Sequence, residues 1–126
     1  MAAYRLRQID DLPSTFHGAV KLAGDALGVQ SFGLQVLDFP AGFSDYPAHD
    51  HTEDGQEEVY VVLAGSADFE VAGEPVRAGA GSLLWVGPES RRDLVAGPDG
   101  VRILALGCVP GGAYERPEGF RASAAA

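Results

Sequence analysis

The sequence has little cysteine, little basic charge and no long hydrophobic run. Its one cysteine, Cys108, excludes an internal disulfide and fits a reducing compartment. Nine basic against eighteen acidic residues give a formal net charge of −9, which argues against a nucleic-acid or anionic-membrane surface. No apolar run approaches the roughly 20 residues of a membrane-spanning helix, and the N-terminus lacks a signal-peptide core. We therefore expect a cytoplasmic protein that binds neither nucleic acid nor membranes.

Helical periodicity is also scarce, whereas turn-forming residues are frequent. Only Phe16 to Leu27 has helical spacing, and Gly28 would end that helix. Seventeen glycines and eight prolines separate short runs of β-forming residues, with turns expected at Gly65–Ser66 and Gly97–Gly100. Such spacing predicts an all-β sandwich or barrel. The expected strands are Phe32–Phe39, Glu58–Ala64, Ala67–Ala72, Val76–Arg77, Ser82–Val86, Arg91–Ala96 and Val101–Val109.

The length of 126 residues allows one domain with one core. We expect an N-terminal arm with a short helical segment over residues 1–31, a barrel over 32–110 and a C-terminal tail over 111–126. Neither a phosphate-binding glycine loop nor a nucleophile elbow is present. Function must therefore be sought in other polar residues.

The most informative polar residues are His49 and His51, followed by the pair Glu57–Glu58 at the start of a strong apolar strand. In an extended segment, residues i and i+2 project to the same face, so both imidazoles can reach one ion. Counting back from Gly65 favours Glu58 over Glu57 as the inward carboxylate. Two histidines and one carboxylate with open positions suit a divalent metal such as iron, manganese, zinc or nickel.

These residues resemble a known family. The run from Gly42 through His49, His51 and Glu58 to Gly65 resembles the first motif of the cupin superfamily, and residues 81–92 resemble its second, more degenerate motif. The resemblance covers about residues 32 to 109. It implies a double-stranded β-helix, or jelly-roll, barrel and a homodimer formed through N-terminal strands. If the protein is an enzyme, the open coordination of a three-ligand metal suggests oxygenase, isomerase or decarboxylase chemistry, without a choice among them.

One departure from the family affects the chemistry. The second-motif histidine, usually a fourth ligand, aligns with Arg92, and a guanidinium cannot coordinate a cation. In one hypothesis His49, His51 and Glu58 hold a metal while Arg92 orients an anionic small-molecule ligand. In the other the protein is a metal-free binding or sensory module, and Arg92 forms a structural ion pair with Glu58. A third reading, in which the histidines lie in an inactive surface loop, is disfavoured by their spacing.

Two aromatic residues are candidate walls for a ligand pocket. Tyr60 and Trp85 each join an apolar ring to a polar handle, which suits the mouth of a small β-barrel. Arg92, Tyr60 and Trp85 are therefore the expected ligand-binding residues. Under both the metal-bound and the metal-free hypothesis, the sequence predicts a small-molecule site.

Overall fold

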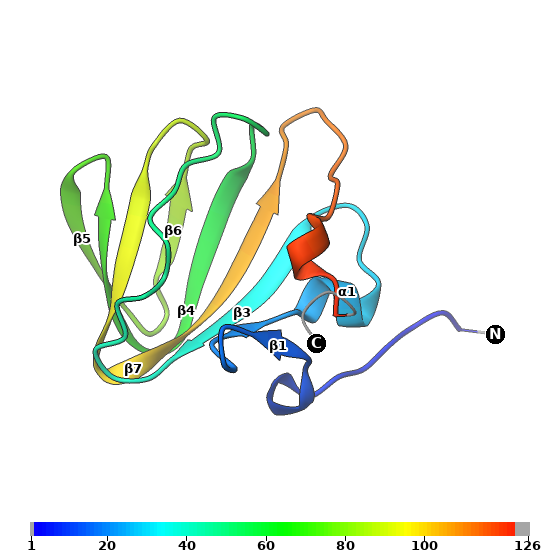
Figure 1. The fold of residues 1–126 in the computed structure, drawn as a ribbon, viewed down its shortest axis with the longest axis horizontal. Coiled ribbons are helices and arrows are strands. Elements are labelled where there is room, and N and C mark those ends of the chain that lie inside the picture. Colours follow the sequence, from blue (N-terminus) through cyan, green and yellow to red (C-terminus); the bar gives the residue numbers. More distant parts are fainter. Residues whose placement is uncertain (1, 123–126) are drawn as a thin grey trace.

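Seven β-strands make up most of the regular structure in residues 2–122, the part of the chain that this computed structural model describes. The strands are β1 (Ser14–Thr15), β2 (Val20–Lys21), β3 (Gly33–Phe39), β4 (Glu57–Val71), β5 (Glu74–Gly79), β6 (Leu83–Val86) and β7 (Arg92–Cys108). Helical structure is limited to α1 (Ala23–Leu27) and the short 3-10 turns η1 (Ile9–Asp11) and η2 (Glu118–Phe120) (Figure 1). The predicted all-β class is confirmed. No helix within residues 2–122 is long and apolar enough to cross a membrane.

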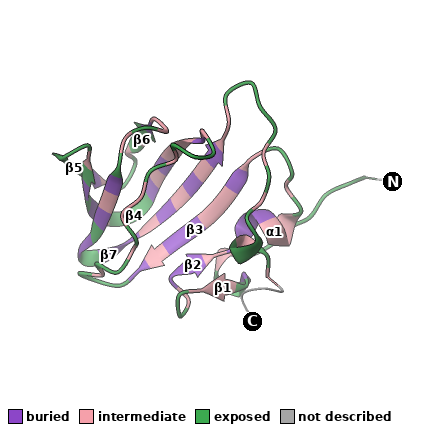
Figure 2. Ribbon diagram, turned by 45° about the horizontal axis from the view of Figure 1, so that its top comes forward, coloured by how far each residue is buried: buried purple, intermediate pink, exposed green. Residues whose placement is uncertain are grey.

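The strands form one antiparallel, strongly curved sheet in the order β1-β2-β3-β7-β4-β5, with β6 paired to β4 beyond the end of β5 (Figure 1). The last strand in the sequence, β7, lies between β3 and β4. Its residues 101–107 pair with β3 on one side and with β4 on the other, whereas its first residues pair with β4 alone. Buried residues alternate with intermediate or exposed ones along parts of β3, β4 and β7 (Figure 2), as expected for strands with one face toward a core.

The two turns expected at Gly65–Ser66 and Gly97–Gly100 are wrong, because β4 and β7 pass through these positions without ending. The pairing of β4 with β7 instead shifts register twice here, between Val62 and Ala64 and again between Gly65 and Ala67. At the second shift the pairs change from Gly65↔Val101 to Ala67↔Ala96. The glycines allow a bulge in place of a turn. Gly65 has φ +73°, and a Cβ there would lie 2.0 Å from the carbonyl oxygen of Gly100, so the two strands approach more closely than a side chain permits.

The helix predicted over Phe16 to Leu27 is mostly wrong. Only its last five residues form α1, which ends at Gly28 in the left-handed conformation as predicted. The earlier residues form the β1–β2 hairpin, whose turn includes Phe16 and His17, both with positive φ. Val20 then pairs with Leu37 of β3. Pairing with the main sheet therefore overrides the local helical spacing, as tertiary contacts often do.

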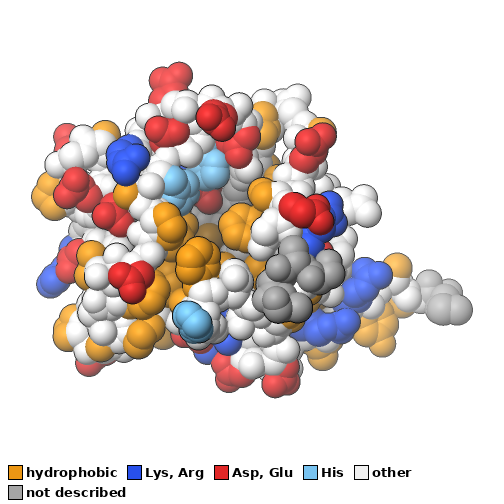
Figure 3. Space-filling model, in the orientation of Figure 1, with side chains coloured by type: hydrophobic (Ala, Val, Ile, Leu, Met, Phe, Trp, Pro, Cys, Tyr) orange, Lys and Arg blue, Asp and Glu red, His pale blue; other side chains and the backbone are white. Residues whose placement is uncertain are grey.

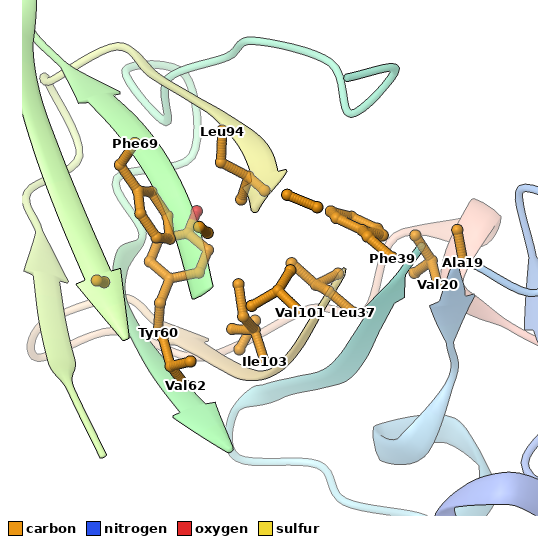
Figure 4. Close-up of a cluster of buried hydrophobic side chains, with 14 of the residues drawn as sticks. Ala19, Val20, Leu37, Phe39, Tyr60, Val62, Phe69, Leu94, Val101 and Ile103 are labelled. Atoms are coloured by element: carbon orange, nitrogen blue, oxygen red, sulfur yellow. The ribbon is translucent and has the colours of Figure 1, made fainter. Parts of the chain in front are cut away.

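The main core fills the concave side of the curved sheet. Tyr60, Phe69 and Ile103 are among its fully buried side chains (Figure 4), and each contributes about 1.5–3 kcal/mol by leaving water. A second, smaller cluster of Leu12, Ala23 and Val36 lies on the opposite face of β3. The N-terminal segment and α1 thus cover that outer face, and the open end of the concave side remains for a site.

Candidate functional site

Three of the predicted residues converge at the start of β4. His49 and His51 lie in the loop before this strand, Glu58 is its second residue, and one ligand atom from each lies within 4.8 Å of the others. Nε2 of His51 is 3.1 Å from Oε1 of Glu58, and Nε2 of His49 is 3.6 Å from the same oxygen. The inward carboxylate is therefore Glu58, as counting from Gly65 predicted.

The loop that carries the histidines is held by backbone bonds and is not a regular strand. His49 forms an isolated bridge with Arg92, in which the amide of each donates to the carbonyl of the other at 3.0 and 2.8 Å. The amide of His51 donates to the carbonyl of Pro88 at 2.8 Å. The region of the degenerate second motif thus positions the first motif through its backbone.

Each imidazole is also fixed through its other ring nitrogen. Nδ1 of His49 is 2.9 Å from the carbonyl oxygen of Pro47, and Nδ1 of His51 is 3.0 Å from Oδ1 of Asp54. A proton on each Nδ1 satisfies these acceptors and leaves each Nε2 free to act as a ligand. Metal-binding histidines are normally oriented in this way. The donor set therefore fits a divalent metal.

Glu58 is held in its ionised form. Its Oε1 accepts from the Tyr60 hydroxyl at 2.8 Å and from Nη1 of Arg92 at 2.5 Å. Burial alone would raise the pKa of Glu58, but the hydrogen bonds from His49, His51 and Tyr60 outweigh it and leave the pKa well below its usual range. A charged carboxylate at this position suits either a metal or the ion pair.

Arg92 lies behind Glu58 and away from the cavity. Its side chain has no exposed surface, and besides the contact with Glu58 its Nε donates to the carbonyl of Ser90 at 3.1 Å and its Nη2 to that of Gly87 at 2.7 Å. Every nitrogen of the guanidinium thus has a protein partner. The structure confirms that Arg92 points inward to Glu58, but it leaves this side chain no surface for a ligand.

The position of His51 between Glu58 and Asp54 can be tested through the pKa of its imidazole. Its hydrogen bond to Glu58 raises its pKa above the ordinary 6.5 against the effect of burial, and the charges of Glu58 and Asp54 act in the same direction. The folded state therefore holds the proton more tightly than the unfolded chain, and the stabilisation is full below pH 6.5 and lost as pH rises through the raised pKa.

We predict that His51→Asn, measured by urea unfolding in the presence of a chelator, loses most stability relative to wild type below pH 6.5. The difference should shrink as the pH rises. The matched control is His17→Asn, in the exposed β1–β2 turn. A loss for His51→Asn that does not vary with pH would mean that the imidazole carries no extra proton in the folded state.

A cavity of about 530 Å³ opens beside the three residues. Its polar end is formed by His49, His51, Glu58, Asp54 and Gln56. The remaining walls come mainly from apolar and aromatic side chains, among them Phe16, Val20, Leu37, Tyr46, Ala105, Tyr114 and Phe120. Figure 3 shows two histidines together at one side of a hollow with hydrophobic walls. This volume and lining are typical of small-molecule sites.

The two predicted aromatic walls lie elsewhere. Tyr60 is fully buried and does not line the cavity; its hydroxyl donates to Glu58 behind it. Trp85 is 61% exposed on β6, and its indole nitrogen donates to Glu57 at 2.8 Å, so it does not reach the cavity. Their places are taken by Tyr46 and by Tyr114 and Phe120 of the C-terminal segment. No motif or periodicity in the sequence marked those three residues.

Comparison with solved structures supports the barrel assignment. A cupin protein from Bacteroides fragilis matches with a TM-score of 0.72 at 21% identity, over 93% of each chain. A sugar phosphate isomerase of the cupin superfamily from Silicibacter pomeroyi matches with a TM-score of 0.62 at 20% identity, over 78% of this chain and 66% of that one. KdgF from Halomonas matches with a TM-score of 0.58 at 17% identity, over 70% and 73%. These identities support the fold alone.

The sequence comparisons agree. No curated protein sequence matches the chain. A family model described as the AraC-like ligand-binding domain matches residues 38–115, which include His49, His51, Glu58, Arg92 and all of β4 to β7. The predicted jelly-roll cupin fold is confirmed. The chain belongs to the AraC-like ligand-binding domain family, and its fold is that of the cupin structures it matches.

Proposed function

We propose that this domain binds a small molecule in the cavity beside His49, His51 and Glu58, and that these three side chains hold a divalent metal there. One observation carries the proposal: the Nδ1 atoms of both imidazoles are engaged by Pro47 and Asp54, which directs both Nε2 atoms toward Glu58. Such outer contacts fix the tautomer that coordinates metal. A metal with three protein ligands keeps open positions and supplies Lewis-acid chemistry to a bound ligand.

The positive charge of Arg92 repels a metal ion bound to Glu58, and a negatively charged ligand would reduce this repulsion. Two unit charges about 4 Å apart at an effective dielectric near 20 interact by roughly 4 kcal/mol. Within residues 2–122, all hydrogen bonds to the Glu58 side chain go to Oε1, so Oε2 is available to a metal. With neutral histidines, Glu58 and Asp54 do not fully balance a divalent ion plus Arg92. The loaded site would therefore be net positive, which favours a ligand with an anionic head.

The walls of the cavity suggest the rest of the ligand. Leu37 and Ala105 form a buried apolar floor, and aromatic rings such as Tyr46 and Phe120 stand beside it. A molecule with one polar or anionic head at the His–Glu cluster and an apolar body fits this division. Among the described residues no lysine or arginine lines the cavity, so a phosphate group would find no ammonium or guanidinium group to bind it. We therefore do not extend the sugar phosphate isomerase activity of the Silicibacter relative to this chain.

A metal-free binding domain is the second candidate, and a specific contact favours it. Nη1 of Arg92 lies 2.5 Å from Oε1 of Glu58, and His51 lies between Glu58 and Asp54, where a proton can take the place of a metal. In that case the cluster is a structural polar network, and the ligand binds through the apolar walls alone.

Metal analysis separates the two candidates. Protein purified without a polyhistidine tag should contain a stoichiometric divalent ion that His51→Ala removes. Asp54→Ala should weaken zinc binding by about 10–100-fold, because it releases the Nδ1 atom of His51. Asp50→Ala is the matched control, since Asp50 lies between the two histidines but, within the described part of the chain, accepts hydrogen bonds from Thr52 alone. Substoichiometric metal that is unchanged in His51→Ala would leave the metal-free candidate.

A further inference from the structure

We propose that residues 109–122 form a wall of the cavity that determines ligand size, and that Arg116 is the positioning residue holding this wall in place. The inference rests on the small-molecule function proposed above. It assigns a role to a segment that the sequence marked only as a tail.

The segment after β7 turns back over the open end of the barrel (Figure 1). Tyr114, Pro117 and Phe120 contribute to the cavity lining from this side, whereas β3 and β7 line the opposite side. Tyr114 lies directly against Gly33 of β3, where an added Cβ would be 3.1 Å from the tyrosine hydroxyl. Phe120 also packs on the main core. Residues 109–122 thus narrow the space between themselves and the sheet.

Contacts with α1 and the residues after it hold the segment in place. The Arg116 side chain is only 10% exposed; its Nη2 donates to the carbonyl of Val29, and its Nη1 lies 3.8 Å from Asp25. The amide of Ala122 donates to the same carboxylate at 2.8 Å. Figure 1 shows η2 beside α1, in agreement with these contacts. Asp25 of α1 therefore binds both Arg116 and Ala122, the residues that flank Pro117 and Phe120 of the cavity wall.

The contacts that hold residues 109–122 in place are weaker than the strand pairing that holds the rest of the cavity wall. The Nε of Arg116 is buried without a hydrogen-bond partner within the described residues, and such a group costs free energy. Residues 109–122 add no strand to the sheet, whereas Leu37 and Ala105 lie in paired strands. Opening is easiest where few bonds must break. This wall is therefore the one that can move to admit a ligand.

The neutral solvatochromic dye Nile red provides a probe, with affinity measured by fluorescence titration. Arg116→Ala should weaken binding by about tenfold, because hydrogen bonds to a charged group are lost and the wall is released. Arg116→Lys should recover part of the affinity through Asp25. Arg121→Ala is the matched control, since the side-chain ion pair of Arg121 within residues 2–122 is with Glu118 of the same segment. Urea unfolding of each variant should show that the barrel remains folded.

A cavity-blocking variant separates the two proposals. Gln35 of β3 lines the cavity from the side opposite the C-terminal segment, and Gln35→Trp should abolish dye binding. If Gln35→Trp binds the dye normally, the dye lies elsewhere and the cavity function is wrong. If Gln35→Trp blocks binding but Arg116→Ala binds as tightly as wild type, the wall proposal alone is overturned.

The second measurement is the slowing of amide hydrogen exchange when the dye binds. If Arg116 contributed to folding alone, its replacement would leave this dye-dependent slowing unchanged. Dye binding should slow exchange in residues 109–122 of the wild type and of Arg121→Ala. In Arg116→Ala this protection should be lost. Equal exchange with and without bound dye in the wild type would contradict a wall that closes on the ligand.

Discussion

Arg92→Met should lower the free energy of unfolding by about 3–5 kcal/mol, as measured by urea denaturation at neutral pH. The guanidinium is fully buried and is the closest cation to Glu58. Methionine fills much of the volume but leaves a buried carboxylate without its ion-pair partner. It also removes the Arg92 donor to the carbonyl of Ser90 and one of the two donors to the carbonyl of Gly87, which keeps the amide of Ser90. Breaking a buried pair from one side costs far more than the pair itself contributes.

The neighbouring Arg91 offers the control. Arg91 is exposed, and Arg91→Met should change stability by no more than about 0.5 kcal/mol. The double variant Glu58→Gln with Arg92→Met removes both charges and should recover part of the loss. If Arg92→Met and Arg91→Met lose similar amounts, the ion pair between Arg92 and Glu58 does not stabilise the fold.

Gly65→Ala should be as damaging, with an expected loss of about 4 kcal/mol or more. The added methyl would lie 2.0 Å from the carbonyl oxygen of Gly100 and 2.8 Å from its carbon, both backbone atoms of β7. Neither can move without shifting the pairing of β4 with β7. The positive φ of +73° adds a further strain of about 1–2 kcal/mol for any residue with a Cβ. Thermal unfolding followed by circular dichroism would measure the sum.

Gly73→Ala separates the backbone strain at positive φ from the steric clash between β4 and β7. Gly73 has a similar φ of +82°, but no atom lies within 4 Å of the position of its Cβ. It should therefore show the backbone strain alone, about 1–2 kcal/mol. Equal losses at Gly65 and Gly73 would mean that the close approach of the strands has no energetic consequence.

Local spacing in the sequence predicted the metal-competent cluster for a partly mistaken reason. We expected His49 and His51 to share one face of a strand. Instead they lie in a loop whose backbone is bonded to Arg92 and Pro88, some forty residues later. The i, i+2 spacing still directs both rings to Glu58, because backbone hydrogen bonds to Arg92 and Pro88 hold both residues of the loop beside the barrel. The predicted cluster is therefore present although the predicted strand is not, because the spacing of the two histidines fixes where their rings point in either case.

Other parts of the site had no local signal. Whether Trp85 faces the cavity or the solvent depends on how β6 pairs with β4, and that pairing is not visible in four residues. The aromatic residues Tyr114 and Phe120 acquire their role only because Arg116 is fixed to α1 by contacts spanning 87 and 91 positions, to Val29 and Asp25. Hairpin formation at Phe16 likewise required β3 as a partner. Long-range pairing, which spacing cannot encode, decided each case.

The central place of β7 has a consequence for synthesis on the ribosome. Both β3 and β4 must wait for their shared neighbour, which is the last strand to emerge. Until then each exposes an apolar strand edge that can pair with another nascent chain. Translation speed over residues 72 to 108 and early chaperone contact should therefore govern how much of this protein reaches its folded form.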